Sequence, residues 1–182
     1  MDSVIIEEKE KRRKKERAYS AAEIESMVKQ YGNMVFRIAL VKMKQKESAD
    51  DIFQEVFIKL IKLKSRLDSH EHERAWMIRT TLNCCKDTWK SAWVRHVVYG
   101  QLDGTNEEDG KMPESEEGVH GLVLKLPDKY RVIVHLYYYE EFSVKEIGVM
   151  LKMNGNTIST RLKRAREILK KELVKGGFNY EI

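Results

Sequence analysis

The chain has 182 residues, of which 34 are Lys or Arg and 29 are Asp or Glu, and 42% of its residues are apolar. That length suits one domain or two small ones, and the composition is typical of a soluble, strongly helical chain rather than a large single-core enzyme. The apolar runs fall far short of the roughly 18 residues that a membrane-spanning helix needs, and no apolar segment of the signal-peptide type follows the charged start. We therefore expect a cytoplasmic protein without direct membrane insertion.

The cysteines and histidines do not favour a metal or redox site. Cys84 and Cys85 are adjacent and poorly placed for an ordinary disulfide, and no second Cys or His pair has zinc-like spacing. Neither His70 nor His72 is expected to be a metal ligand. We expect reduced thiols, no metal and no cofactor.

Charge is distributed unevenly along the chain. The net charge is +2 over residues 1–17, +4 over 18–98, −6 over 99–121 and +5 over 122–182. The acidic stretch contains few large apolar residues and is longer than most loops within a compact domain, which is typical of a flexible linker. The sequence therefore predicts a charged tail followed by two small helical domains that an acidic linker joins, with bounds 1–19, 20–98, 99–121 and 122–182.

Two helices are predicted at the start of the first domain. Ser20 and Glu23 have capping-box spacing and precede an apolar stripe of helical period, which predicts a helix over 21–44. Ser48 is the expected cap of a second helix that ends near residue 64, with acidic residues in its first turn. Its outward face would carry a compact acidic and amide patch, for which a solvated helix start is the alternative explanation: Asp50, Asp51, Gln54 and Glu55.

A third helix is predicted over 74–95, after a polar loop at 65–73. Its core stripe would consist of Ile78, Leu82, Cys85 and Trp89. A second stripe is polar and cationic: Arg79, Asn83, Lys86 and Lys90. Because single-stranded nucleic acid binds positive grooves beside aromatic rings, Trp76 next to this stripe is a candidate stacking residue, and a core position is the alternative.

The second domain has the pattern of a helix-turn-helix. A helix is predicted from Leu126-Pro127-Asp128 to residue 139, and Ser143 with Glu146 forms a second capping box over a short helix. Asn154 is the expected cap of a longer final helix. This order, with an apolar inner stripe and a basic outer face on the last helix, is typical of a DNA reader.

The final helix separates two kinds of candidate DNA contact. Between residues 156 and 175 there are seven Lys or Arg and only two Glu, which indicates binding to phosphates, although a basic surface helix is the alternative. We expect the side chains near its start to face a major groove: Asn156, Ser159, Thr160 and Lys163. Three arginines would reach flanking phosphates: Arg161, Arg164 and Arg166.

These motifs together resemble bacterial sigma factors of the extracytoplasmic-function group. The run SADDIFQEVF at 48–57 resembles their region 2.2, and WMIR at 76–79 with the residues to Asp87 resembles regions 2.3 and 2.4. Residues 126–166, which end in NTISTRLKRAR, resemble region 4. The resemblance covers most of residues 20–173.

The resemblance implies a non-catalytic initiation subunit that docks onto core RNA polymerase, recognises two upstream promoter elements and helps melt the duplex. It implies that the acidic and amide patch of residues 50–55 binds core polymerase. The element nearest the start site would be held as a single strand by Asp68, Ser69, His70, His72, Trp76, Arg79, Asn83, Lys86 and Lys90. The farther element would be read as duplex by Asn156, Thr157, Ser159, Thr160, Arg161, Lys163, Arg164 and Arg166. An anti-sigma protein is a further expected partner.

Two other functions are compatible with parts of this pattern. A free-standing helix-turn-helix regulator would bind duplex DNA as a dimer without polymerase and would recognise two equal half-sites. A nucleic-acid enzyme such as a recombinase would need a catalytic domain and an activated nucleophile, and the sequence offers neither pattern.

Overall fold

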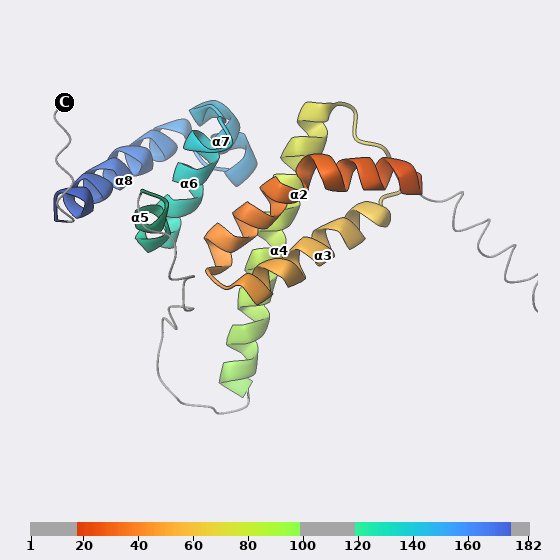
Figure 1. Ribbon diagram of the computed structural model, residues 1–182, viewed down its shortest axis with the longest axis horizontal. Coiled ribbons are helices and arrows are strands. Elements are labelled where there is room, and N and C mark those ends of the chain that lie inside the picture. The colour runs from red at the N-terminus through yellow and green to blue at the C-terminus, as the bar shows by residue number, and fades with distance from the viewer. Residues whose placement is uncertain (1–17, 99–118, 176–182) are drawn as a thin grey trace, which may run out of the picture.

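The computed structural model describes residues 18–98 and 119–175, and the regular structure in these two stretches is entirely helical. The N-terminal bundle consists of α2 (Ala21–Met43), α3 (Lys46–Ile61) and α4 (His70–Val98). The C-terminal bundle consists of α5 (Val119–Lys125), α6 (Asp128–Tyr138), α7 (Val144–Leu151) and α8 (Gly155–Lys175). Figure 1 shows the two bundles beside one another, with the long helix α4 crossing α2 and α3. The all-α fold class is confirmed, whereas residues 1–17 and 99–118 of the expected tail and linker lie outside the described residues.

Both predicted capping boxes are present. The Ser20 hydroxyl accepts a hydrogen bond from the Glu23 amide at 3.3 Å, while the Glu23 carboxylate accepts one from the Ser20 amide at 2.8 Å. Ser143 and Glu146 repeat this arrangement at 3.2 and 2.8 Å. Because each box satisfies amides that the first helical turn leaves without partners, it fixes where α2 and α7 begin.

Helix α3 begins earlier than predicted. Its N-cap is Gln45, whose side chain makes no capping hydrogen bond, and the Ala49 amide donates to the Gln45 carbonyl at 3.0 Å. The prediction that Ser48 caps this helix is therefore wrong, and Asp50 and Asp51 lie in its second turn. The reason is that Lys46 and Glu47 are good helix formers, so the helix continues one turn toward the N-terminus.

Helix α4 also begins before its predicted start. Ser69 accepts a hydrogen bond on its side-chain oxygen from the His72 amide at 3.2 Å, and its carbonyl accepts one from the Glu73 amide at 2.8 Å. This cap makes His70 and His72 part of the first helical turn rather than of a loop. The expected loop is thereby shortened to the residues between α3 and Ser69.

The N-terminal bundle is organised around apolar side chains from all three helices. Val35, Ile52 and Met77 are at most 1% exposed and belong to one hydrophobic cluster. Burying a side chain of this size contributes about 1.5–3 kcal/mol. Trp89 does not share this environment, because 52% of its surface is exposed. The prediction that Trp89 belongs to the core is wrong, because the ring lies at the surface beside Lys42 and Met43 at the end of α2.

The helix-turn-helix geometry depends on a close backbone approach at Gly148. The Met153 amide donates to the Gly148 carbonyl at 2.8 Å, and Lys152 adopts a left-handed conformation with φ 54°. A Cβ at position 148 would lie 2.8 Å from the Met153 carbonyl oxygen. Only glycine fits this turn without a shift of the backbone, so the residue fixes how α7 enters α8.

Helix α5 is not anticipated by the sequence pattern. It includes residues 119–121, which the sequence analysis assigns to the linker. Val123 and Leu124 are buried, and the guanidinium of the buried Arg131 donates to the Leu124 carbonyl at 3.1 Å. Because seven residues are too few for a stable isolated helix, packing against α6 and α8 is what holds α5 in place.

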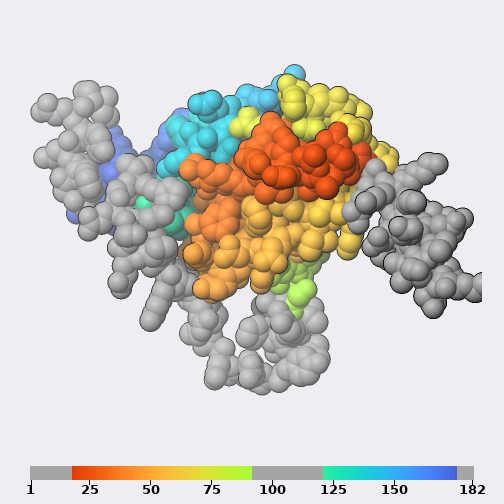
Figure 2. Space-filling view, turned by 45° about the vertical axis from the view of Figure 1, so that its right-hand side comes forward, coloured from red at the N-terminus to blue at the C-terminus, as the bar shows by residue number. Residues whose placement is uncertain are grey.

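The two bundles pack against each other. In Figure 2 the surface of the C-terminal bundle lies directly against that of the N-terminal bundle. Ile38 of α2 and Ile78 of α4 are at most 1% exposed and belong to the same hydrophobic cluster as Ile133 of α6 and Ile147 of α7. The N-terminal and C-terminal bundles therefore share an apolar interface.

Candidate functional site

The acidic patch of α3 is exposed at the surface of the N-terminal bundle. Asp50, Asp51 and Gln54 are exposed, whereas Glu55 is partly buried. Glu55 pairs with Lys59 one turn later at 2.8 Å, and this contact raises the pKa of Lys59 to about 12. The structure thus places all four predicted residues on one helix but leaves only the first three free of a strong local partner among the described residues.

A shallow apolar groove adjoins this patch. The groove has a volume of about 420 Å³ and lies between α2 and α3, where it is lined by Phe36, Phe53 and Asp50. A Cβ at Gly32 would lie 3.3 Å from the Phe53 ring, so the absence of a side chain at this position leaves space in the groove. An acidic rim beside exposed aromatic edges is suited to a partner that combines cationic and apolar side chains.

The N-terminal end of α4 carries four of the predicted promoter contacts. Asp68 and His72 approach each other at 3.3 Å, and His70 lies 3.1 Å from the carboxylate of Glu73. The Tyr31 hydroxyl donates to the same Glu73 carboxylate at 3.0 Å. Burial and this hydrogen bond raise the pKa of Tyr31 to about 12. The structure therefore brings Asp68, Ser69, His70 and His72 together, although local pairing and capping already engage them.

The polar stripe of α4 lies on the helix face directed away from the bundle core. Asn83, Lys86 and Lys90 are exposed, while Arg79 is partly buried and donates to the Ala75 carbonyl at 3.3 Å. Trp76 is partly buried and packs against the N-terminal core. The stripe is continuous as predicted, but Trp76 offers only part of its ring.

Trp89, which the sequence pattern assigns to the core, is a second candidate stacking residue. Its indole nitrogen lies 3.1 Å from the sulfur of Met43, and the Lys42 ammonium lies 5.7 Å from the ring centroid. Lys90 is the next residue in the chain, and Lys86 lies about one turn earlier on α4. Because the Trp89 ring is exposed and lies among cations, it offers a better stacking surface than the partly buried Trp76. The position of Trp89 toward the end of a long helix is the sequence feature that could have indicated its exposure.

The outer face of α8 is largely exposed. The Asn154 side chain accepts a hydrogen bond from the Asn156 amide at 2.8 Å, which confirms its predicted capping role. The seven exposed residues among the predicted contacts are Asn156, Thr157, Ser159, Thr160, Lys163, Arg164 and Arg166. The buried side of the helix consists of Ile158, Leu162 and Ala165. The separation into an apolar inner face and a polar outer face is confirmed.

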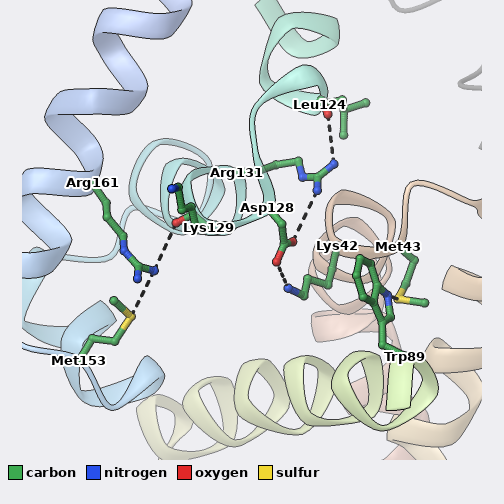
Figure 3. Close-up of polar contacts among 9 residues, drawn as sticks. All are labelled: Lys42, Met43, Trp89, Leu124, Asp128, Lys129, Arg131, Met153 and Arg161. Atoms are coloured by element: carbon green, nitrogen blue, oxygen red, sulfur yellow. Dashed lines mark hydrogen bonds and ion pairs between the residues drawn. The ribbon is translucent and has the colours of Figure 1, made fainter. Parts of the chain in front are cut away.

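Two arginines of α8 are held by contacts within the protein. Arg166 donates from Nε to the Tyr138 hydroxyl at 2.6 Å, and its guanidinium lies 6.0 Å from the Tyr137 ring centroid. Arg161 is partly buried and donates to the Lys129 carbonyl at 3.5 Å (Figure 3). Arg164 makes no such contact with a described residue, so the three arginines differ in how firmly they are positioned.

Two open grooves flank the start of α8. One, of about 600 Å³, runs between α7 and α8 and is lined by Lys145, Lys152 and Asn156. The other, of about 410 Å³, lies on the opposite side and is lined by Lys129 and Arg164. The lysines at 129, 145 and 152 were not among the predicted contacts, because they lie on other helices and become neighbours of α8 only through folding.

Neither cysteine is poised for chemistry. Both are buried, and burial raises the pKa of Cys84 and raises that of Cys85 to about 12. Each sulfur therefore stays a thiol near neutral pH. Within residues 18–98 and 119–175 no three His, Cys, Asp or Glu side chains are grouped to hold a metal ion, and no helix there is long and apolar enough to cross a bilayer.

Both bundles match known protein families. Residues 27–95 match sigma-70 region 2, and residues 117–169 match sigma-70 region 4. The matches together cover more than half of the chain and coincide with the N-terminal and C-terminal bundles. The match to region 2 favours a sigma factor over the free-standing regulator, whose first domain would have no reason to resemble it.

Curated relatives support the same family. The chain is 28% identical over 158 residues to the ECF RNA polymerase sigma factor SigW of Bacillus subtilis (strain 168), covering 79% of this chain and 84% of the relative. It is 27% identical over 165 residues to SigM of the same organism, covering 87% and 99%.

A solved structure supports the fold. The sigma factor RpoE of Bartonella quintana, crystallised in complex with the anti-sigma factor NepR, is 18% identical to this chain. Its TM-score is 0.62, with 84% of this chain and 97% of that chain covered. Taken with the two bundles, the acidic patch and the helix-turn-helix, these matches show that the chain belongs to the sigma-70 family and is an RNA polymerase sigma factor of the extracytoplasmic-function type.

Proposed function

We propose that the acidic patch of α3 is the main docking surface for core RNA polymerase. The observation that supports this most directly is the exposure of Asp50, Asp51 and Gln54 on one helix face, in a protein of net charge +5. The apolar groove beside Asp50 extends the same surface. A basic partner helix with apolar side chains would satisfy both parts.

Reversing one charge of this patch tests the proposal. Asp51→Arg replaces attraction by repulsion and is expected to weaken binding to core polymerase about tenfold or more. Glu25→Arg is the matched control, because Glu25 is exposed on α2 and pairs only with Lys29 there among the described residues. Binding is measured by fluorescence anisotropy with purified core polymerase, and circular dichroism verifies the fold. Equal affinities for the two variants would contradict the docking role.

We further propose that α8 reads the farther promoter element in the major groove of duplex DNA. Asn156, Ser159 and Lys163 present donors and acceptors from the exposed face, and the capped N-terminus of the helix is favourable for a phosphate. Arg164 and the three lysines at 129, 145 and 152 would contact phosphates on either side.

Selectivity and salt dependence test this second role separately. Lys163→Ala is expected to reduce the preference for the specific element over scrambled DNA by about 1–3 kcal/mol. Lys171→Ala removes the same charge two turns farther along α8 and serves as the control. About five phosphate contacts would give a slope of log affinity against log salt of roughly −4 to −5. An unchanged promoter preference in the first variant, or a flat salt response, would contradict the assignment.

The outward stripe of α4 is proposed to hold the nearer element as a single strand. Asn83, Lys86 and Lys90 supply donors and positive charge, and the exposed Trp89 adds a stacking surface beside them. Extruding a base from the duplex costs a few kcal/mol, which stacking and base contacts would offset. Trp89→Ala is expected to slow promoter opening, measured by the reactivity of unpaired thymines to permanganate, while Trp89→Phe retains most of the effect.

Sigma factors are non-catalytic initiation subunits, and we infer that this chain likewise has no catalytic activity of its own. Polymerase docking also implies that it works in the cytoplasm. Because the similar RpoE structure is a complex with an anti-sigma factor, we propose that an anti-sigma protein is a partner of this chain as well. Co-purification of a tagged chain, followed by identification of the bound protein, tests that partner.

A further inference from the structure

We propose that in the absence of polymerase the two bundles are held closed by a latch formed by two cations of the N-terminal bundle and two carboxylates of the C-terminal bundle. Its members are Arg74 with Glu140, and Lys42 with Asp128. Both pairs join segments that are far apart in the sequence.

Arg74 occupies a socket at the end of α6. Its Nη2 donates to the backbone carbonyl of Glu140 at 2.5 Å and lies 3.4 Å from one oxygen of the Glu140 carboxylate. The guanidinium lies over the Phe142 ring, 4.1 Å from its centroid. The side chain of Glu140 is 10% exposed, and its other oxygen lies 3.4 Å from His135. An aromatic floor, a carbonyl and a buried carboxylate together fit a planar guanidinium better than an ammonium.

Lys42 forms the second point of contact and joins three helices. Its ammonium pairs with Asp128 in the first turn of α6, and it also lies near the Trp89 ring of α4 (Figure 3). Asp128 is held in turn by the guanidinium of Arg131, at 3.5 Å. The carboxylate that receives Lys42 is therefore oriented by a buried residue of its own bundle.

An apolar seam lies between the two ionic contacts. Ile38 and Ile78 are at most 1% exposed and share a hydrophobic cluster with Ile133 and Leu136 of α6. Separation of the bundles would expose both isoleucines to water, which favours the closed arrangement. The two ionic pairs fix the orientation of one bundle relative to the other, because aliphatic side chains alone would allow the bundles to slide past each other.

Closure covers one edge of the promoter-facing side of α4. Leu82, Lys86 and Trp89 line a cleft of about 320 Å³ whose opposite wall is formed by Val132 and Met153 of the C-terminal bundle. A nucleic-acid strand that uses Lys86 and Trp89 would have to displace that wall. This consequence rests on the proposed function of α4, whereas the latch itself rests only on the contacts between the bundles.

Distance measurements between spin labels test the latch. Labels on cysteines introduced at the exposed positions Glu47 of α3 and Lys170 of α8 report the separation of the bundles, because native Cys84 and Cys85 are buried. We compare the latch variant Lys42→Glu/Arg74→Glu with the control Lys29→Glu/Lys64→Glu, which has the same charge change at exposed positions.

The full-length wild type and the control are expected to show a narrow short distance. In the latch variant the open population should rise about tenfold, and the distance distribution should broaden toward longer values. Asp128→Asn/Glu140→Gln weakens the latch from the other bundle and is expected to open it to a smaller extent. A wild type that is already broad, or latch variants that match the control while remaining helical by circular dichroism, would overturn the proposal.

A binding measurement separates the latch from the proposed function of α4. In the Asp128→Asn/Glu140→Gln variant, which leaves the cations beside Trp89 unchanged, the affinity for a fluorescent single-stranded oligonucleotide containing the nearer promoter element should rise by the same factor as the open population. The comparison is with Glu25→Gln/Glu47→Gln, which has the same charge change at exposed positions. Longer distances with this gain support both inferences. Longer distances without it support the latch and overturn the proposed role of α4.

Discussion

The guanidinium of Arg166 is fixed by the hydroxyl of Tyr138, to which its Nε donates a hydrogen bond at 2.6 Å. The two residues lie on α8 and at the end of α6, so the contact joins the helix that we propose reads DNA to a helix that packs against it. Tyr138 is 50% exposed, so the contact lies at the surface of the protein. We interpret Tyr138 as a positioning residue for a phosphate contact by Arg166.

Removing the Tyr138 hydroxyl should weaken DNA binding without removing a charge. Tyr138→Phe is expected to lower the affinity of the full chain for promoter duplex about two- to fivefold, because Arg166 loses its restraint and must be ordered on binding. The salt slope should stay unchanged. Arg166→Ala should instead reduce that slope by about one unit. An altered slope in Tyr138→Phe, or an unaltered one in Arg166→Ala, would contradict the assignment.

The turn between α7 and α8 should not tolerate a side chain at position 148. Gly148→Ala brings a methyl group against the Met153 carbonyl and is expected to destabilise the protein by about 1–3 kcal/mol, measured by urea unfolding. Gly155→Ala is the control, because its Cβ would make an ordinary 3.6 Å contact with Val144. Similar stability losses in the two variants would contradict the role given to Gly148.

The first capping box should give a defined pH dependence. Hydrogen bonds from the Ser20 amide and hydroxyl, and then from Arg66, lower the pKa of Glu23 from 4.5 to about 2. Because the folded-state pKa is the lower one, the ionised carboxylate stabilises the fold above about pH 4.5, and this contribution disappears as the pH falls toward 2.

Comparison with Glu23→Gln isolates that contribution. The wild type should be more stable than Glu23→Gln at pH 6, and the difference in free energy of unfolding should shrink steadily between pH 4.5 and pH 2. Chemical denaturation at several pH values measures it. A difference that is constant over this range would show that the Glu23 carboxylate does not carry the effect.

Local signals in the sequence predict the helices well where a side chain caps them. Ser20 and Ser143 each begin a helix as expected. Helix α3 begins after Gln45, which makes no side-chain capping hydrogen bond. Ser48 is the more favourable capping residue, and for that reason the predicted start of the helix was three residues too late. Helix α5 was not predicted, because its seven residues carry no strong helix signal of their own. Its stability comes from tertiary contacts such as that of Arg131 with Leu124.

The functional surfaces are predictable only as far as they lie on one helix. The structure places the candidate residues of α3 and of α8 each on one helix, as their spacing predicts, whereas no sequence pattern links the lysines of α6 and α7 to α8. The spacing of Ile38 and Ile78 indicates that they are buried but not against which partner. Contacts between bundles, including Arg74 with Glu140, depend on tertiary geometry that periodicity does not contain.

Transcription in vitro tests the central conclusion most directly. Core RNA polymerase is combined with fragmented genomic DNA of the source organism, with the wild-type chain, with Asp51→Arg, or without either. We predict discrete transcripts that require the wild-type chain and that are strongly reduced with Asp51→Arg. Absence of specific initiation, together with a stable DNA complex formed without polymerase, would contradict the assignment as a sigma factor.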